Sequence, residues 1–167
     1  MQNVEMWRSA IRPGNPGRVA APELPDLDIQ PAQDFARNNQ FLAMLNAFRR
    51  SGGLARAQEV SCRFRSQSAS DVSPLAGWIA NRQVISLEWQ SKIWMPLFQF
   101  NPSALTLRTG LSAVLAELNQ IHDDWGVATW FAQPNSRLAG GAPADMLAAS
   151  ASQVLNATFA ERSAAPG

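Results

Sequence analysis

The chain has 167 residues, 46% hydrophobic and 16% charged, which is enough for one domain with a real core and leaves few charges for its surface. One cysteine, Cys62, and one histidine, His122, exclude an internal disulfide framework and a zinc site built from these residue types. The net charge is +1, but residues 35–100 carry eight basic against three acidic residues, so only this middle segment has an electrostatic reason to bind phosphate.

The first segment, residues 1–34, is rich in proline and glycine. Such a composition does not sustain a helix or a central strand, so we expect an extended arm that need not be ordered. Trp7 is the one residue that would anchor this arm to the body or to a neighbour.

The second segment, residues 35–100, is predicted to hold three helices and a β-hairpin. Apolar residues at helical spacing indicate helices over 35–50 and 54–64, and Asp71 or Ser73 can cap a third helix with Pro74 at its first position. Alternation then predicts strands over 84–89 and 93–100, and Pro96 puts the second strand at an edge or at a bulge. Three short helices followed by a hairpin resemble a winged helix-turn-helix.

The third segment, residues 101–163, is predicted to be a small helical domain. A strongly periodic helix begins near Leu111 with Thr109 as its cap, and Asp123 or Asp124 caps the next helix, which Pro134 ends. After a turn at 140–141, Pro143 opens another short helix, and Ser152 caps the last one, which runs to about Arg162. The predicted fold class is therefore mainly α.

No catalytic constellation is visible. His122 is best interpreted as a helix-terminal residue, Cys62 as a buried structural cysteine, and neither glycine pair belongs to a phosphate-binding loop. We therefore expect no enzyme, no cofactor and no metal site. Tryptophan is enriched both in cores and at interfaces, and Trp94 and Trp130 are the two candidates for an interface.

The basic residues of the middle segment allow two interpretations. They form either a solvated basic face or a weak nucleic-acid-binding surface. The candidates for such a surface are Arg49, Arg50, Arg56, Arg63, Arg65 and Arg82. The third helix offers only Asn81, Arg82 and Gln83 for contacts with base edges.

Residues 130–147 read WFAQPNSRLAGGAPADML. This stretch resembles the pattern W-h-x-x-P-N-x-x-L-x-G-x-x-P-x-x-h-L of the toxin-binding domain in Xre/MbcA/ParS-type antitoxins, and the resemblance covers roughly 93–162. The pattern also has a structural meaning, since Pro134 stops a helix, Asn135 braces a tight loop, and Gly140 permits a positive φ.

The resemblance implies a function by binding. Members of that family neutralise a toxin, commonly a RES-type enzyme that consumes NAD, and many bind their own promoter and form dimers. Together with the tryptophan argument it predicts partner-binding roles for Trp94, Trp130, Asn135, Arg137 and Arg162, the last being the only charged group placed to plug an NAD site. The alternatives are a DNA-binding regulator and an interaction or scaffold protein without a toxin. No membrane-spanning run is present, and we expect a cytoplasmic protein.

Overall fold

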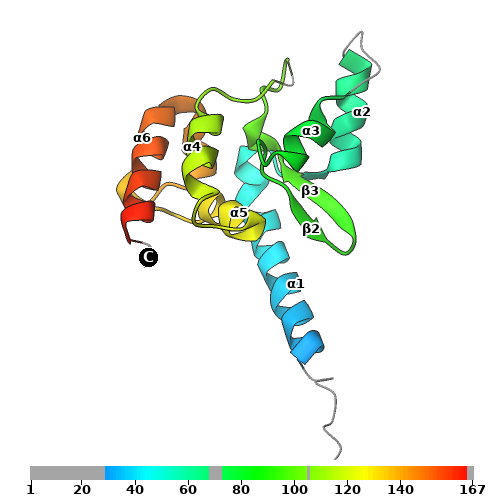
Figure 1. Cartoon of the computed structure of the whole chain (residues 1–167), viewed down its shortest axis with the longest axis horizontal. Helices are drawn as coiled ribbons and strands as arrows, with labels where there is room; N and C mark the ends of the chain where they lie inside the picture. Colours follow the sequence, from blue (N-terminus) through cyan, green and yellow to red (C-terminus); the bar gives the residue numbers. More distant parts are fainter. Residues whose placement is uncertain (1–28, 68–72, 105, 165–167) are drawn as a thin grey trace, which may run out of the picture.

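The computed structural model describes residues 29–67, 73–104 and 106–164, and its elements are mainly helical (Figure 1). In chain order they are α1 (Ile29–Ala47), η1 (Phe48–Ser51), β1 (Leu54–Arg56), α2 (Ala57–Gln67), α3 (Leu75–Ala80), β2 (Leu87–Trp89), β3 (Lys92–Pro96), η2 (Leu97–Gln99), α4 (Leu111–Leu118), α5 (Asp124–Ala132), η3 (Ser136–Leu138) and α6 (Pro143–Ala164). The predicted fold class, mainly α with a small antiparallel sheet, is confirmed.

The first helix corrects the predicted boundary of the arm. Residues 29–34, expected to be extended, form the start of α1, where Pro31 lies in the first turn. A proline is tolerated there because the first N–H groups of a helix have no partner within the helix. The rest of the predicted arm, with Trp7, lies outside the described residues.

A short strand precedes the second helix. The sequence predicted a helix from Leu54, but Leu54–Arg56 instead pairs antiparallel with β3, and the helix begins only at Ala57. Gly52 and Gly53 precede this strand with φ of 111° and 85°, a conformation that glycine adopts without strain. They direct the chain out of η1 and into the sheet.

The sheet has the order β1-β3-β2, so β3 is its central strand. The prediction of an edge or bulged position for β3 is therefore wrong, and Pro96 is accommodated because it is the last residue of the strand. The sequence of helix, strand, two helices and two strands, with the last strand in the middle, is the connectivity of a winged helix-turn-helix unit.

Buried Gln99 explains why the first predicted strand, 84–89, is shorter than expected. Its Oε1 accepts from the Ile85 N–H at 2.7 Å, and its Nε2 donates to the carbonyls of Ile85 at 3.0 Å and Pro96 at 2.9 Å. The side chain therefore replaces a neighbouring strand as the partner of the Ile85 backbone, and β2 starts only at Leu87.

Two clusters of buried side chains form the core. The smaller one joins α2, α3 and β3 through Val60, Phe64, Leu75 and Met95. The larger one combines residues from both sides of the predicted boundary at 100–101, among them Phe41, Phe48, Phe98, Leu118, Phe131 and Val154. The helical C-terminal part thus shares its main core with α1 and the sheet.

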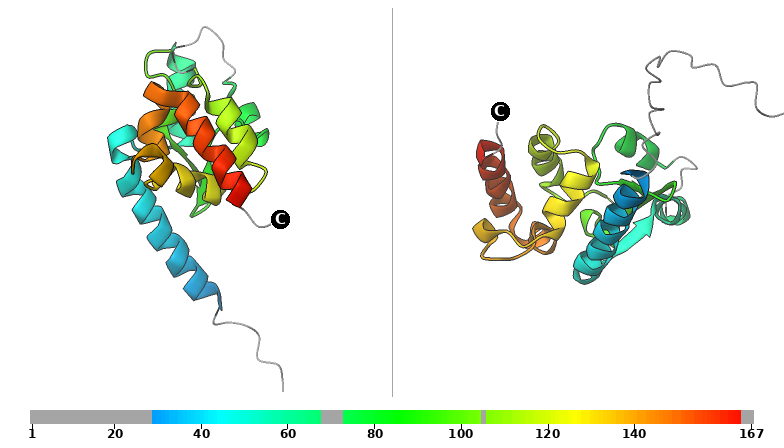
Figure 2. Two further views of the ribbon diagram at one scale, coloured as in Figure 1. Left: turned by 90° about the vertical axis from the view of Figure 1, so that its left-hand side faces the viewer. Right: turned by 90° about the horizontal axis from the view of Figure 1, so that it is seen from below.

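The C-terminal helices form the layer farthest from α3 (Figure 1). Helices α4 and α6 run side by side, and α1 leaves the body so that its N-terminal half stands clear of them (Figure 2). Gln40 of α1 donates to Thr129 of α5 at 2.9 Å, which ties the protruding helix to this layer.

The helix starts in this layer were predicted with mixed success. Asp123 caps α5 as expected, accepting from the Gly126 N–H at 2.7 Å. The expected cap at Thr109 is wrong, since Gly110 holds that position with φ of 87° and no side-chain cap bond. The two predicted last helices are present as the two halves of α6, which non-helical Ser150 separates with φ of −146° and ψ of 55°.

Candidate partner-binding site

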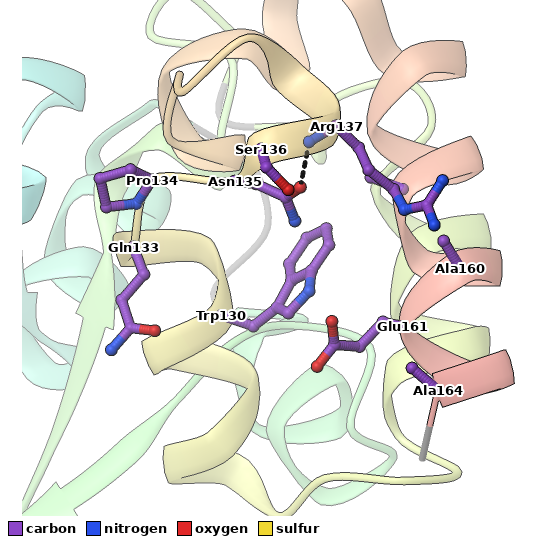
Figure 3. Close-up of a pocket in the computed structure, with 10 residues that line it drawn as sticks. Trp130, Gln133, Pro134, Asn135, Ser136, Arg137, Ala160, Glu161 and Ala164 are labelled. Atoms are coloured by element: carbon purple, nitrogen blue, oxygen red, sulfur yellow. Dashed lines mark hydrogen bonds between the residues drawn. The ribbon is translucent and has the colours of Figure 1, made fainter.

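A pocket of about 300 Å³ brings together three of the predicted partner-binding residues, Trp130, Asn135 and Arg137 (Figure 3). The end of α5 and the loop after it supply these residues, and the last turns of α6 close the other side. The remaining lining residues are Gln133, Pro134, Ser136, Ala157, Ala160, Glu161 and Ala164.

Asn135 shapes the loop that carries Arg137. Its Oδ1 accepts from the Arg137 N–H at 2.9 Å, and its carbonyl accepts from the N–H groups of Leu138 and Gly140, both at 3.0 Å. Its own N–H donates to the Gly141 carbonyl at 3.1 Å. An asparagine can brace a turn in this way because its short side chain reaches the nearby backbone.

Tight packing holds the same loop against the body. Leu138 and Leu147 are buried, and Gly140 has φ of 82°. A Cβ on Gly141 would come within 2.7 Å of the Met146 sulfur and 3.2 Å of the Leu138 carbonyl oxygen. The motif is therefore a structural clasp as well as the wall of a pocket.

Trp130 is the innermost polar residue of the pocket. Its side chain is only 8% exposed and packs edge-on against Phe131, with ring centroids 5.1 Å apart. Its Nε1 is buried and has no hydrogen-bond partner. Indole nitrogen is a donor only, and a buried donor without an acceptor is uncommon in folded proteins.

The two charged residues of the pocket differ in their surroundings. Arg137 is exposed and makes no ion pair within the described part of the chain. The Glu161 carboxylate lies 3.6 Å from Nε2 of His122, an imidazole that would pair with it when protonated. A second hollow, of about 430 Å³, adjoins the other side of Arg137, so this arginine stands between two concave surfaces.

Two predicted partner-binding residues lie outside the pocket. Trp94 is in β3, where it packs edge-on against Phe41 with ring centroids 5.1 Å apart and under the Arg56 guanidinium. Arg162 is next to Glu161 in sequence but points to α4, where it pairs with Glu117. Neither residue lines the same concavity as Trp130.

Sequence reasoning missed Glu161 and Gln133. Glu161 lies four residues after Ala157, and Ala164 lies three residues further, so helical periodicity puts all three on one face of α6. That face could be found from the sequence, but its position opposite Trp130 could not.

The basic candidates are distributed over η1, β1 and α2. Five of them are exposed: Arg49, Arg50, Arg56, Arg63 and Arg65. Arg82 instead donates to Asp124 at 2.9 Å and to the carbonyls of Asn119 and His122 at 3.3 and 3.0 Å. It ties the end of α3 to the corner between α4 and α5.

Helix α3 has the position of a recognition helix but few groups for base contacts. Its exposed residues are Ala76, Gly77 and Ala80, followed by Asn81, whose amide donates to the Gly77 carbonyl at 2.9 Å. Small apolar side chains cannot read the donor and acceptor pattern of the major groove.

The described residues hold no candidate metal centre, and Cys62 is not where the sequence predicted it. No group of three or more His, Cys, Asp or Glu side chains that could hold a metal ion occurs in residues 29–67, 73–104 and 106–164. Cys62, expected to be buried, is exposed on α2, where Arg65 approaches its sulfur at 3.4 Å.

Comparisons with known proteins return no match to a family model, to a curated protein or to a solved structure. Within the described part of the chain, every helix is too short or too polar to cross a membrane.

Proposed function

We propose that this protein is an antitoxin-like binding protein, without enzymatic activity of its own, which neutralises a partner toxin through the surface around Trp130, Asn135 and Arg137. The observation that carries the proposal is that these three motif residues line one pocket. In the part of the chain that the structure describes, its indole N–H has no hydrogen-bond partner and its arginine forms no ion pair. The resemblance of residues 130–147 implies that the toxin is a RES-type, NAD-consuming enzyme.

The shape and composition of this surface support protein binding. Hollows of about 300 and 430 Å³ lie on the two sides of Arg137, so a partner could seat side chains in both. Tryptophan and arginine are the residues that most often dominate interface energetics. Both hollows also reach α6, through Ala157.

Capture from the source cells tests this function. The tagged full chain should retain a small enzyme in stoichiometric amount, that enzyme should arrest growth when expressed alone, and co-expression of this chain should restore growth. Arg137→Ala should weaken capture at least about tenfold, as expected for a central interface arginine. The matched control is Arg63→Ala, which removes an exposed arginine from α2 and should leave capture unchanged.

Two results would count against this function. One is the absence of any captured enzyme whose toxicity the chain relieves. The other is equal loss of capture in Arg137→Ala and Arg63→Ala, which would mean that the protein acts through general charge and not through this pocket.

DNA binding is the second candidate function, because the connectivity of residues 29–96 is that of a winged helix-turn-helix. If the protein regulates a promoter, its affinity for that DNA should fall steeply with salt, and Arg63→Ala with Arg65→Ala should reduce the salt slope by roughly 2. Affinity that is insensitive to both substitutions and to salt would exclude this use of α2.

A dimer and a cytoplasmic location also belong to the proposal. The most exposed large apolar side chains in the described residues include Phe35 and Leu42, at 68% and 54%, which lie seven residues apart on α1 and so share a face. Sedimentation of the full chain should show a dimer that Leu42→Ser weakens.

A further inference from the structure

The pocket beside Trp130 holds more hydrogen-bond donors than it uses. The indole N–H of Trp130 is buried and unpartnered, and the Arg137 guanidinium has no carboxylate within ion-pair distance among the described residues. The Oδ1 atom of Asn135 is occupied by the Arg137 N–H, which fixes the amide so that its NH₂ group faces the indole ring (Figure 3).

The acceptors in the pocket do not balance these donors. Glu161 is the one carboxylate of the lining, and its Oε1 lies 3.6 Å from His122 Nε2. Figure 3 shows this carboxylate beside the nitrogen-bearing edge of Trp130, yet the indole nitrogen has no hydrogen-bond partner. The Glu161 carboxylate of the pocket thus lies near an imidazole, whereas no carboxylate among the described residues lies within ion-pair distance of Arg137.

We propose that this pocket binds the carboxylate of an Asp or Glu side chain that the partner protein presents. The inference rests on the proposed partner-binding function and specifies its chemistry. Arg137 is exposed, Asn135 is half-buried and Trp130 is buried, so the pocket has donors at three depths, with the Arg137 guanidinium drawn beside Ala160 and apart from the indole nitrogen (Figure 3). A carboxylate accepts charge-assisted bonds from all three types of group.

The depth of the indole nitrogen favours a side chain as the source of the carboxylate. Less than 1 Å² of this atom is accessible to water, so only a narrow group on a flexible stem can approach it after a small adjustment of Glu161. A chain terminus is broader because its carboxylate is attached directly to a branched Cα.

Nuclear magnetic resonance of the full chain provides the test. Capped tripeptides of the form acetyl-Gly-X-Gly-amide, with X being Glu, Gln or Lys, are titrated against the tryptophan indole resonances, together with acetyl-Gly-Gly-Gly bearing a free carboxyl terminus. Trp94 is an internal control, because its indole nitrogen is also buried and unpartnered but lies outside the pocket. Trp130→Phe and Trp94→Phe identify the two signals.

The Glu peptide alone should move the Trp130 indole resonance in a saturable manner, and the Trp94 resonance should stay in place. Arg137→Gln should weaken this binding roughly tenfold, because a charge-assisted contact is lost. Glu161→Gln should strengthen binding a few-fold, since it removes a like charge. Lys92→Gln, which removes an exposed cation at the start of β3, is the control and should change nothing.

Four results would overturn the inference. The first is the absence of a shift with the Glu peptide. The second is a shift with the Lys peptide that Glu161→Gln abolishes, which would make the pocket a cation site. The third is a response to the free carboxyl terminus alone. The fourth is a shift of the Trp130 signal in peptide-free Glu161→Ala as large as that caused by peptide, which would identify Glu161 as the acceptor of the indole.

This test is separable from that of the proposed function. If a toxin is captured and neutralised but the Glu peptide does not bind, the carboxylate inference fails and the function stands. If the Glu peptide binds at Trp130 and no toxin is found, the antitoxin function fails while the pocket chemistry stands.

Discussion

Two arginines, one directly after α3 and one in the loop after α5, show how differently the two regions of the molecule use polar residues. The guanidinium of Arg82, directly after α3, donates hydrogen bonds to Asp124 and to two backbone carbonyls of the α4–α5 corner. Arg137, in the loop after α5, forms no ion pair in the described residues and stands between two hollows. The first arginine holds the molecule together, and the second is available to a partner.

The surfaces around these arginines also differ in how many polar groups they offer to a partner. The exposed part of α3 carries Ala76, Gly77 and Ala80, whereas the segment from Trp130 to Arg137 carries amide, indole and guanidinium groups. A winged helix-turn-helix connectivity therefore does not by itself make α3 a reader of DNA. The comparison suggests that the N-terminal unit supports a site located in the C-terminal layer.

The largest expected effect tests whether the two regions are one folding unit. Phe131 is fully buried and packs against Phe98 with ring centroids 5.1 Å apart and an interplanar angle of 38°. Phe131→Ala should lower the free energy of unfolding by about 3–5 kcal/mol. In urea denaturation, fluorescence and circular dichroism should still give one transition, because the larger core spans both regions.

Phe159→Ala is the control, since this side chain is 41% exposed, and it should change stability little. Two separate transitions in Phe131→Ala would show that the two regions unfold independently and are not one folding unit.

A second prediction concerns the polar core of the N-terminal unit. Gln99→Met keeps the approximate volume of the side chain but leaves the Ile85 N–H and carbonyl without partners. Each orphaned buried group costs about 1–3 kcal/mol, so we expect a loss of roughly 2–6 kcal/mol in urea denaturation.

Gln120→Met is the matched substitution, because Gln120 is exposed and bonds only to the Ala116 carbonyl. Equal losses in the two variants would mean that the buried bonds of Gln99 contribute nothing special to the fold.

The third prediction addresses the joint formed by Arg82. Arg82→Gln removes the contacts with Asp124 and His122, and we expect a loss of about 1–2 kcal/mol because the side chain is partly exposed and its bonds compete with water. Hydrogen exchange should rise at the α4–α5 corner. Arg137→Gln removes no ion pair or side-chain hydrogen bond seen in the described residues and should leave stability unchanged. A comparable loss there would contradict the distinction between the two arginines.

The smallest expected effect compares the change in stability on replacing one glycine of each region by alanine. Gly140→Ala should destabilise the protein by about 1–2 kcal/mol, because its φ of 82° is unfavourable for a residue with a Cβ. Gly77→Ala should stabilise it by about 0.5–1 kcal/mol, because this residue is inside α3 with nothing within 4 Å of an added Cβ. Thermal unfolding should give opposite signs, and equal signs would show that the loop does not require its left-handed backbone.

Local patterns predicted much of the fold. Helical periodicity located α1, α4 and α5, and Asp123 was recognised as a cap because capping depends on residues a few positions apart. The same reasoning failed at β1 and at the start of β2, where the decisive partners are β3 and Gln99, more than ten residues away. Such pairings are not visible in a local window.

The sequence by itself determined which residue types surround the candidate site, since Trp130, Asn135 and Arg137 belong to one short motif whose loop geometry follows from proline, asparagine and glycine. Only the tertiary structure decided that Glu161 would complete the pocket, that Arg162 would turn to Glu117, and that Trp94 would lie elsewhere. The physical reason is that backbone preferences act over a few residues, whereas the packing of α6 against α4 and α5 decides which side chains from distant parts of the chain meet.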